Sequence, residues 1–367
     1  MRGLYVHIPF CIKKCKYCDF TSYTGCGNVF DRYIAEMANE MEKYRGEEID
    51  TVFIGGGTPT IFSPLQLTAL LNNIRNIFNI SRSAEITIEA NPKTLSEEKL
   101  SALKKGGVNR LSIGVQSFNN SELETIGRVH NESDAENAVK LSQKCRFSNI
   151  NLDIMFSLPG QTNESFKYTL EKAISLNPTH ISCYSLILEE HTPLYDDVMS
   201  GKVKLCDEET DRALYEYACK FFSAHGFNQY EISNFAHQGY KCKHNLKYWN
   251  CDEYVGVGVA AHSYFKGERF FNTASLDDYL SGRYSGGIAE KIEGKDAISE
   301  FIIMGLRKTA GIEKKEFKKR FGKEIGELYK TEIEKFKRAG LMEEDDITLR
   351  LTFEGVNVSN AVLCEFV

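Results

Sequence analysis

Apolar residues in the first half of the chain recur in short runs, and amphipathic stretches separate them. The runs are Gly3–Ile8, Asp50–Ile54, Glu85–Glu89, Arg110–Gly114, Asn149–Met155 and His180–Leu186. They are rich in β-branched residues, which is typical of buried parallel strands. The stretches between them predict helices over Val29–Lys43, Pro64–Phe78, Ser96–Lys105, Glu132–Gln143 and Glu164–Leu176. Six alternating strand–helix units predict an α/β fold, a partial parallel (β/α)6 barrel.

The pattern changes in the second half of the chain. A helix is predicted over Glu208–His225, and no clean period follows in the Tyr-, Asn- and Gly-rich stretch 226–265. Farther on, Lys and Glu become dense, and the pattern predicts helices over Asp296–Leu306 and Lys314–Ala339 and a strand over Asp346–Phe353. We therefore predict a barrel over 1–225, an irregular extension over 226–290, and a small α+β, winged-helix-like accessory domain over 291–367.

Composition narrows the class of protein. The 367 residues are 42% hydrophobic and 26% charged, as in ordinary soluble proteins, and the net charge of −6 argues against nucleic acid as a partner. No apolar run approaches the roughly 20 residues of a membrane span, and the N-terminus does not resemble a signal peptide. We expect a cytoplasmic protein with reduced thiols, in which a tight cluster among eleven cysteines favours metal binding over disulfides.

That cluster follows the first predicted strand. Cys11, Cys15 and Cys18 have the spacing C-x3-C-x2-C. Three thiolates can hold a [4Fe–4S] cluster and leave one iron free for a further ligand. A structural zinc site normally takes four protein ligands, and Asp19 or His7 would supply a fourth only at an unusual spacing. The cluster is the favoured interpretation, and zinc remains the alternative.

The motif Cys-x3-Cys-x-aromatic-Cys after a first barrel strand resembles the radical-SAM superfamily. The resemblance implies that S-adenosylmethionine chelates the open iron, and that its reductive cleavage can yield a 5′-deoxyadenosyl radical. The run from Gly55 to Pro59 follows the second strand and resembles the superfamily element that binds the methionine amino group. On this resemblance we assign that role to Gly56, Gly57 and Thr58, since glycine lets backbone approach a ligand.

Other polar residues stand at predicted strand ends, where parallel barrels place their sites. Singly, each fits a cap, a turn or a surface charge. Together their spacing resembles the coproporphyrinogen-dehydrogenase-like branch of the superfamily, which implies contacts with S-adenosylmethionine. An arginine among them suits the carboxylate of that cofactor. The residues are Glu89, Gln116, Arg128 and Asp153, with Tyr5 and Tyr17 at the flanking aromatic positions.

Two members of this branch compete. The oxygen-independent coproporphyrinogen III dehydrogenase has a further cysteine where Phe20 stands here, and a long extension where only ten residues precede Cys11. We therefore do not expect that activity, and whether the protein is an enzyme stays open. The sequence Cys18-Asp19-Phe20 instead resembles the HemW family of haem chaperones.

A second motif supports the same resemblance. His244-Asn-Leu-Lys-Tyr248-Trp249 matches the H-N-x-x-Y-W motif associated with haem binding in HemW. A neutral imidazole can ligate haem iron, and the aromatic residues could shield a porphyrin. The competing interpretation is a hydrogen-bonding His–Asn pair beside core aromatics. The resemblance favours His244 as a haem ligand, whereas we expect His262 to be structural or pocket-lining.

The resemblance implies a haem chaperone that binds haem and transfers it to an acceptor protein, with the cluster and S-adenosylmethionine in a supporting or regulatory role. A membrane-associated respiratory enzyme is one candidate acceptor, and a homodimer is one candidate assembly. The alternative is a radical-SAM oxidoreductase of the coproporphyrinogen III dehydrogenase type. A methyl- or sulfur-transferase is the least favoured hypothesis.

Overall fold

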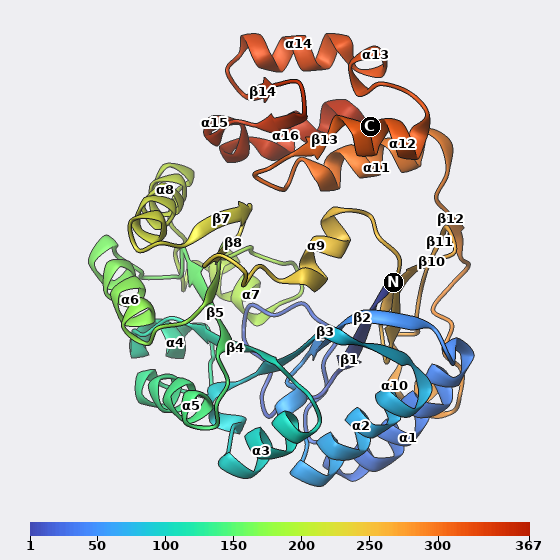
Figure 1. The fold of residues 1–367 in the computed structure, drawn as a ribbon. Helices are drawn as coiled ribbons and strands as arrows, with labels where there is room; N and C mark the ends of the chain where they lie inside the picture. The colour runs from blue at the N-terminus through green and yellow to red at the C-terminus, as the bar shows by residue number, and fades with distance from the viewer.

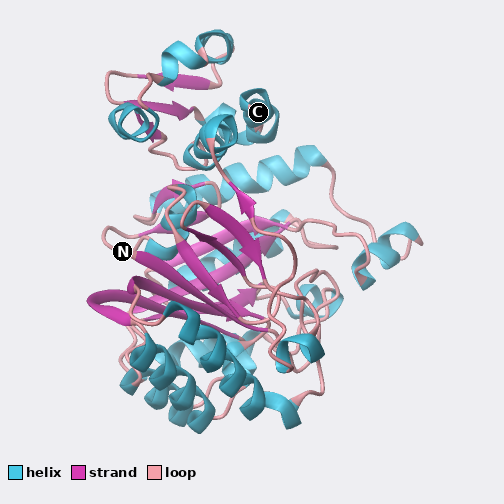
Figure 2. Cartoon of the chain, turned by 90° about the vertical axis from the view of Figure 1, so that its right-hand side faces the viewer, coloured by secondary structure: helices cyan, strands magenta, loops and turns pink.

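The six predicted strand–helix units are present in the computed structural model, which describes all residues from Met1 to Val367. Their strands lie side by side in chain order, and each pairs in parallel with the next. The strands are β1 (Arg2–Ile8), β2 (Glu48–Gly56), β3 (Asn79–Ala90), β4 (Arg110–Gln116), β5 (Asn149–Phe156) and β6 (His180–Ser185). The curved sheet in Figures 1 and 2 confirms the predicted α/β parallel architecture.

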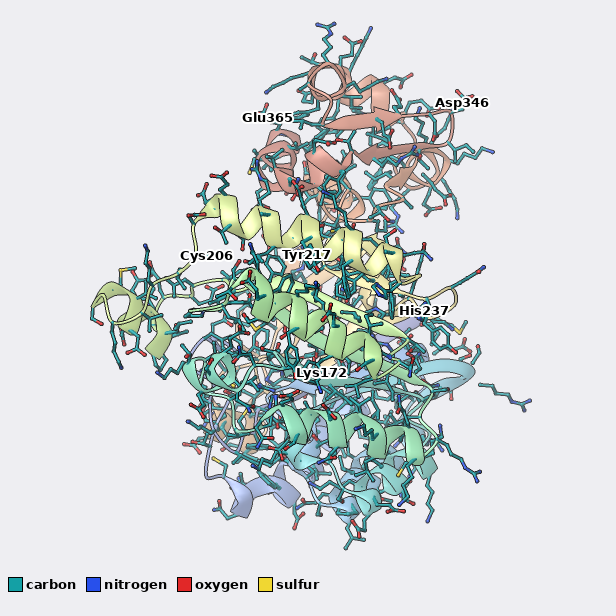
Figure 3. The ribbon with its side chains drawn as sticks, turned by 90° about the vertical axis from the view of Figure 1, so that its left-hand side faces the viewer. Lys172, Cys206, Tyr217, His237, Asp346 and Glu365 are labelled. Atoms are coloured by element: carbon teal, nitrogen blue, oxygen red, sulfur yellow. The ribbon has the colours of Figure 1, made fainter.

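Helices cover the outer face of this sheet (Figure 1). They are α1 (Phe30–Met41), α2 (Pro64–Ile77), α3 (Glu97–Lys105), α5 (Glu132–Lys144), α6 (Asn163–Ser175) and α8 (Glu208–Ala224). Two shorter helices, α4 (Asn120–Thr125) and α7 (Pro193–Met199), follow the ends of β4 and β6, and α7 lies against the loop after β1. Side-chain caps fix several helix starts, as where Ser63 and Gln66 form a reciprocal capping box. Figure 3 shows α6, which carries Lys172, beside α8, which carries Tyr217. None of the helices combines the length and apolar character needed to cross a membrane.

We expected an irregular extension over 226–290. The segment instead forms regular elements that extend the sheet at both edges. Beside β6 it adds the antiparallel strands β8 (Asn234–Ala236) and β7 (Asn228–Glu231). Beside β1 it adds the parallel strand β9 (Tyr254–Val257), followed by β10 (His262–Phe265), β11 (Glu268–Phe271) and β12 (Glu290–Lys291). The helices α9 (Lys243–Trp249) and α10 (Leu276–Leu280) lie between these strands in sequence. Strands of two to four residues are too short to show an alternating pattern.

The last part of the chain packs around its own apolar core, which includes Phe301, Phe317 and Phe336. In a small antiparallel sheet, β15 (Thr348–Leu351) lies between β13 (Ile312–Glu313) and β14 (Met342–Glu344). The predicted helix over Lys314–Ala339 is wrong, because the chain turns at Gly322 with φ 71° and the helix breaks into three. The elements are α11 (Gly294–Gly305), β13 (Ile312–Glu313), α12 (Lys314–Phe321), α13 (Ile325–Leu328), α14 (Lys330–Arg338), β14 (Met342–Glu344), β15 (Thr348–Leu351), α15 (Phe353–Asn357) and α16 (Ser359–Leu363).

Candidate cluster and S-adenosylmethionine site

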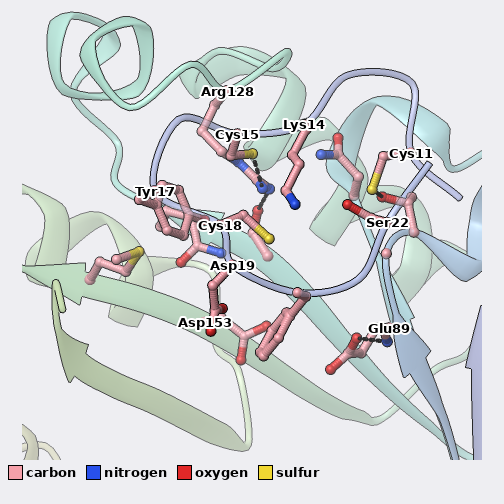
Figure 4. A pocket seen from close by; sticks show the side chains of 18 of the residues that line it. Cys11, Lys14, Cys15, Tyr17, Cys18, Asp19, Ser22, Glu89, Arg128 and Asp153 are labelled. Atoms are coloured by element: carbon pink, nitrogen blue, oxygen red, sulfur yellow. Dashed lines mark hydrogen bonds between the residues drawn. The ribbon is translucent and has the colours of Figure 1, made fainter. Parts of the chain in front are cut away.

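A pocket of about 420 Å³ opens at the carboxyl ends of the parallel strands, and the loop after β1 borders it (Figure 4). This loop carries the three clustered cysteines, and the strand ends supply the remaining polar groups. Every residue predicted to hold the cluster or S-adenosylmethionine lines the pocket except Tyr5. The set is Cys11, Cys15, Tyr17, Cys18, Gly56, Gly57, Thr58, Glu89, Gln116, Arg128 and Asp153.

The cysteine thiols are half-buried and unpaired. Cys11 Sγ lies 3.7 Å from Thr58 Oγ1, and Arg128 Nη1 donates to Cys15 Sγ at 3.4 Å. Burial raises the pKa of Cys11, and it raises the pKa of Cys18 to about 11, so both would release protons on binding iron. No three metal-binding side chains converge on one point suited to a single ion. Zinc needs such a point, whereas each thiolate of a cubane binds a different iron, so this donor set fits the cluster better.

The glycine turn after β2 presses against the cysteine loop. Thr58 N donates to Phe10 O at 2.8 Å, which ties the two loops together. A Cβ atom on Gly57 would lie 2.7 Å from Phe10 O and 3.0 Å from Cys11 Sγ. Gly56 has φ 108°, a conformation that other residues rarely adopt. Only glycine therefore fits the turn that borders the pocket beside Cys11.

Two carboxyl groups, Glu89 and Asp153, line the side of the pocket formed by the strands (Figure 4). Glu89 Oε2 accepts from Gly56 N at 3.0 Å, and Asp153 Oδ1 accepts from Asn151 Nδ2 at 2.7 Å. Desolvation, with a further contribution from Asp153, raises the pKa of Glu89 to about 8, and burial raises that of Asp153. A cationic ligand would stabilise the ionised forms, so the pair is suited to ammonium or sulfonium groups.

An arginine stands on the opposite side, near Cys15 (Figure 4). Arg128 Nη2 donates to Gly114 O, while its buried Nε has no partner. A guanidinium with a free donor can bind a carboxylate. Gln116 ends β4 with φ 66°, and its Oε1 accepts from Tyr184 Oη at 3.2 Å. The pocket therefore offers acidic groups and a cationic group to an amino-acid ligand.

Two residues that the sequence analysis missed complete these contacts. Ser112 in β4 donates to Asp153 at 3.3 Å, and Tyr184 in β6 holds Gln116. Ser112 stands between two apolar residues of its predicted strand, which was the available signal, whereas Tyr184 lies in a strand with several other polar residues and nothing in the pattern marked it. Their importance depends on which strands become neighbours.

Comparison with known proteins identifies the family. The Radical SAM superfamily model matches residues 5–173, and the HemN C-terminal domain model matches 292–358. The heme chaperone HemW of Bacillus subtilis is 38% identical over 100% of this chain and 99% of its own length. HemW of Escherichia coli is 36% identical over 86% of this chain and 85% of its length. The chain belongs to the HemW family.

A solved structure confirms the fold of this HemW-family chain. Coproporphyrinogen III oxidase (HemN) from Escherichia coli superposes with a TM-score of 0.85, covering 99% of this chain and 89% of the other. Its sequence identity is 23%, so the likeness concerns architecture alone. Membership of the radical SAM superfamily implies a [4Fe–4S] cluster and S-adenosylmethionine as cofactors.

Two predicted residues of this HemW-family chain lie outside the pocket. Tyr5 on β1 bonds through its hydroxyl to His7 Nδ1 at 2.9 Å. His244, on α9, lies near the amino ends of β1 and β2, with Nδ1 2.9 Å from Thr51 Oγ1 and Nε2 2.9 Å from Tyr248 Oη. Its side chain is 1% exposed, and burial lowers its pKa to about 3, so the ring is neutral. Both ring nitrogens are engaged, and an iron could reach them only if α9 moved.

Proposed function

We propose that this protein is a haem chaperone, which binds haem and passes it to an acceptor protein. The observation that carries the proposal is the 38% identity, over the whole chain, to a protein named heme chaperone HemW. Phe20 adds to it, because the motif of coproporphyrinogen III dehydrogenase has a cysteine at this position. A membrane-associated respiratory enzyme is the acceptor class that we favour.

The pocket would hold the two cofactors of the superfamily. We assign Cys11, Cys15 and Cys18 to the cluster, which supplies the electron for reductive chemistry when it is bound. The turn at Gly56, Gly57 and Thr58 would present backbone groups to the methionine moiety. Acidic and basic side chains would orient the remainder of S-adenosylmethionine, with Glu89 and Asp153 facing cationic or hydroxyl groups and Arg128 facing the carboxylate.

Anaerobic haem titration of the reconstituted protein tests the proposal. We expect saturable binding with a shifted Soret band, followed by transfer of the haem to an apo-haem protein added in excess. A parallel reaction with reductant, S-adenosylmethionine and coproporphyrinogen III should release no carbon dioxide. Release of carbon dioxide, or the absence of saturable haem binding, would overturn the proposed function.

A further inference from the structure

A chain of polar side chains runs through the barrel from the cofactor pocket to the start of α9. It begins at Asp153, which lines the pocket and accepts a hydrogen bond from Asn151 Nδ2 at 2.7 Å. The two residues lie two positions apart on β5, so their side chains point to the same face of the strand. The chain of bonds therefore starts inside the site that we assign to S-adenosylmethionine.

His180 and Tyr230 continue the chain. Asn151 Oδ1 lies 2.6 Å from His180 Nδ1, and His180 Nε2 lies 2.8 Å from Tyr230 Oη. Tyr230 Oη accepts from the backbone N–H of Cys242 at 3.2 Å, and Cys242 immediately precedes α9. These four residues are at most 3% exposed, so bulk water does not compete for their hydrogen bonds.

All the hydrogen bonds of this chain have the same direction. The amide nitrogen of Asn151 donates to Asp153 and to Ser112 Oγ, so its carbonyl oxygen faces His180 as an acceptor. Burial lowers the pKa of His180 well below its usual value, and the neutral ring has one donor and one acceptor nitrogen. Nδ1 therefore donates to Asn151, and Nε2 accepts from Tyr230. Each donor points away from α9 and toward Asp153, an arrangement in which successive hydrogen bonds strengthen one another.

Glu85 holds the same end of α9. Its Oε1 accepts from His244 N at 3.2 Å and from Cys242 Sγ at 3.6 Å. The helix has seven residues and no side-chain cap of its own, so Tyr230 and Glu85 supply acceptors for the backbone at its start. Because an iron could reach His244 only if α9 moved, these contacts also restrain access to His244.

We propose that Asn151, His180 and Tyr230 are positioning residues that couple the cofactor pocket to α9, so that bound S-adenosylmethionine holds α9 more firmly in place. A cationic ligand keeps Asp153 ionised, and an ionised carboxylate accepts stronger hydrogen bonds than a neutral one. The effect passes along the chain to the N–H of Cys242. The coupling rests on the proposed S-adenosylmethionine site and does not require haem. Because coupling between sites is reciprocal, breaking the chain should weaken S-adenosylmethionine binding by the same factor.

Hydrogen–deuterium exchange of the anaerobically reconstituted protein, with and without saturating S-adenosylmethionine, tests the coupling. Tyr230→Phe removes only the hydroxyl group in the chain. Tyr279→Phe is the matched control, because Tyr279 is also buried and its hydroxyl donates to Glu40, outside the chain. In wild type and Tyr279→Phe, the ligand should slow exchange over 242–249 about fivefold more than exchange in α6.

In Tyr230→Phe this additional slowing should disappear, and the affinity for S-adenosylmethionine should fall by about fivefold. S-adenosylhomocysteine, which lacks the sulfonium charge, should slow exchange over 242–249 less than S-adenosylmethionine does in wild type. Circular dichroism and cluster content confirm that each variant is folded and loaded.

The outcomes separate this inference from the proposals around it. The same additional slowing in wild type and Tyr230→Phe would overturn the coupling, because α9 would then respond without the chain. Its loss in both variants would also overturn the coupling, because the loss of any buried hydroxyl would then suffice. Equal effects of the two ligands would exclude the charge at Asp153 as the origin and overturn the proposal. If wild-type protein binds no S-adenosylmethionine, the proposed cofactor site fails and the coupling fails with it. Absence of haem binding would overturn the chaperone function and leave the coupling standing.

Discussion

Replacing Glu89 by glutamine should change how protein stability depends on pH. The pKa of Glu89 is raised from 4.5 to about 8, first by desolvation and then by Asp153. Between these values the folded protein keeps a proton that the unfolded chain releases. Stability therefore falls as pH rises through this window, because the folded state binds more protons than the unfolded state. Glutamine is neutral throughout and lacks this dependence.

The structure sets the size of the effect. The interval from 4.5 to about 8 corresponds to an upper limit of about 5 kcal/mol, at about 1.4 kcal/mol per pKa unit. Glu89 is half-buried because it faces the pocket, where water screens its charge. We therefore expect wild-type protein to lose about 2–3 kcal/mol relative to Glu89→Gln between about pH 5 and about pH 8.

Urea unfolding of cofactor-free wild type and Glu89→Gln across this range measures the difference directly. Glu48→Gln is the matched control, because Glu48 is exposed on the neighbouring strand β2. The wild-type and control curves should decline together with rising pH, while the Glu89→Gln curve declines less. Parallel curves for all three proteins would show that Glu89 is already ionised in the folded state and would refute the reasoning.

Three further outcomes follow from the geometry. Gly57→Ala should lose cluster and S-adenosylmethionine binding, because the added Cβ meets Phe10 O at 2.7 Å. The control Gly27→Ala, whose added Cβ has no atom within 4 Å, should keep both, and equal iron and cofactor content in the two variants would contradict the prediction. Cys15→Ser should lose cluster iron and its visible absorption, and full iron content would refute the three-thiolate assignment. His244→Ala should lower the free energy of unfolding by about 2–4 kcal/mol, since two buried hydrogen bonds are lost, and an unchanged urea midpoint would argue against that role.

The barrel could be predicted because its signals are local. Most positions of the parallel strands are buried, so their apolar and β-branched residues stand out along the chain, and caps such as Ser63 fix helix starts. The C-terminal helix broke because Gly322 adopts a left-handed conformation that the Lys- and Glu-rich periodicity could not reveal. The short strands of 226–290 were missed because they depend on pairing with β1 and β6, two strands that are distant in sequence.

The pocket was predictable for a related reason. Parallel strands end at the same edge, so polar residues toward the carboxyl ends of β3 and β5, such as Glu89 and Asp153, lie near one another there. The place of His244 was not predictable in this way, because it depends on α9 packing against Thr51, 193 positions away. A resemblance can assign a role to a motif. Long-range packing determines at which end of the barrel the motif lies, and the resemblance does not give that position.

The position of α9 changes how variants of its motif should be interpreted. Lys247 Nζ lies 2.8 Å from Asp50 Oδ1 and donates to Met1 O at 3.1 Å, while His244 lies against Gly3, so α9 secures the start of β1. The end of β1 leads directly into the cysteine loop, which lines the cofactor pocket. A substitution in α9 can therefore disturb that pocket through β1 without removing an iron ligand. Lost haem affinity in a His244 variant is consequently compatible with either role, and only the spectrum of the axial ligand distinguishes ligation from support of β1.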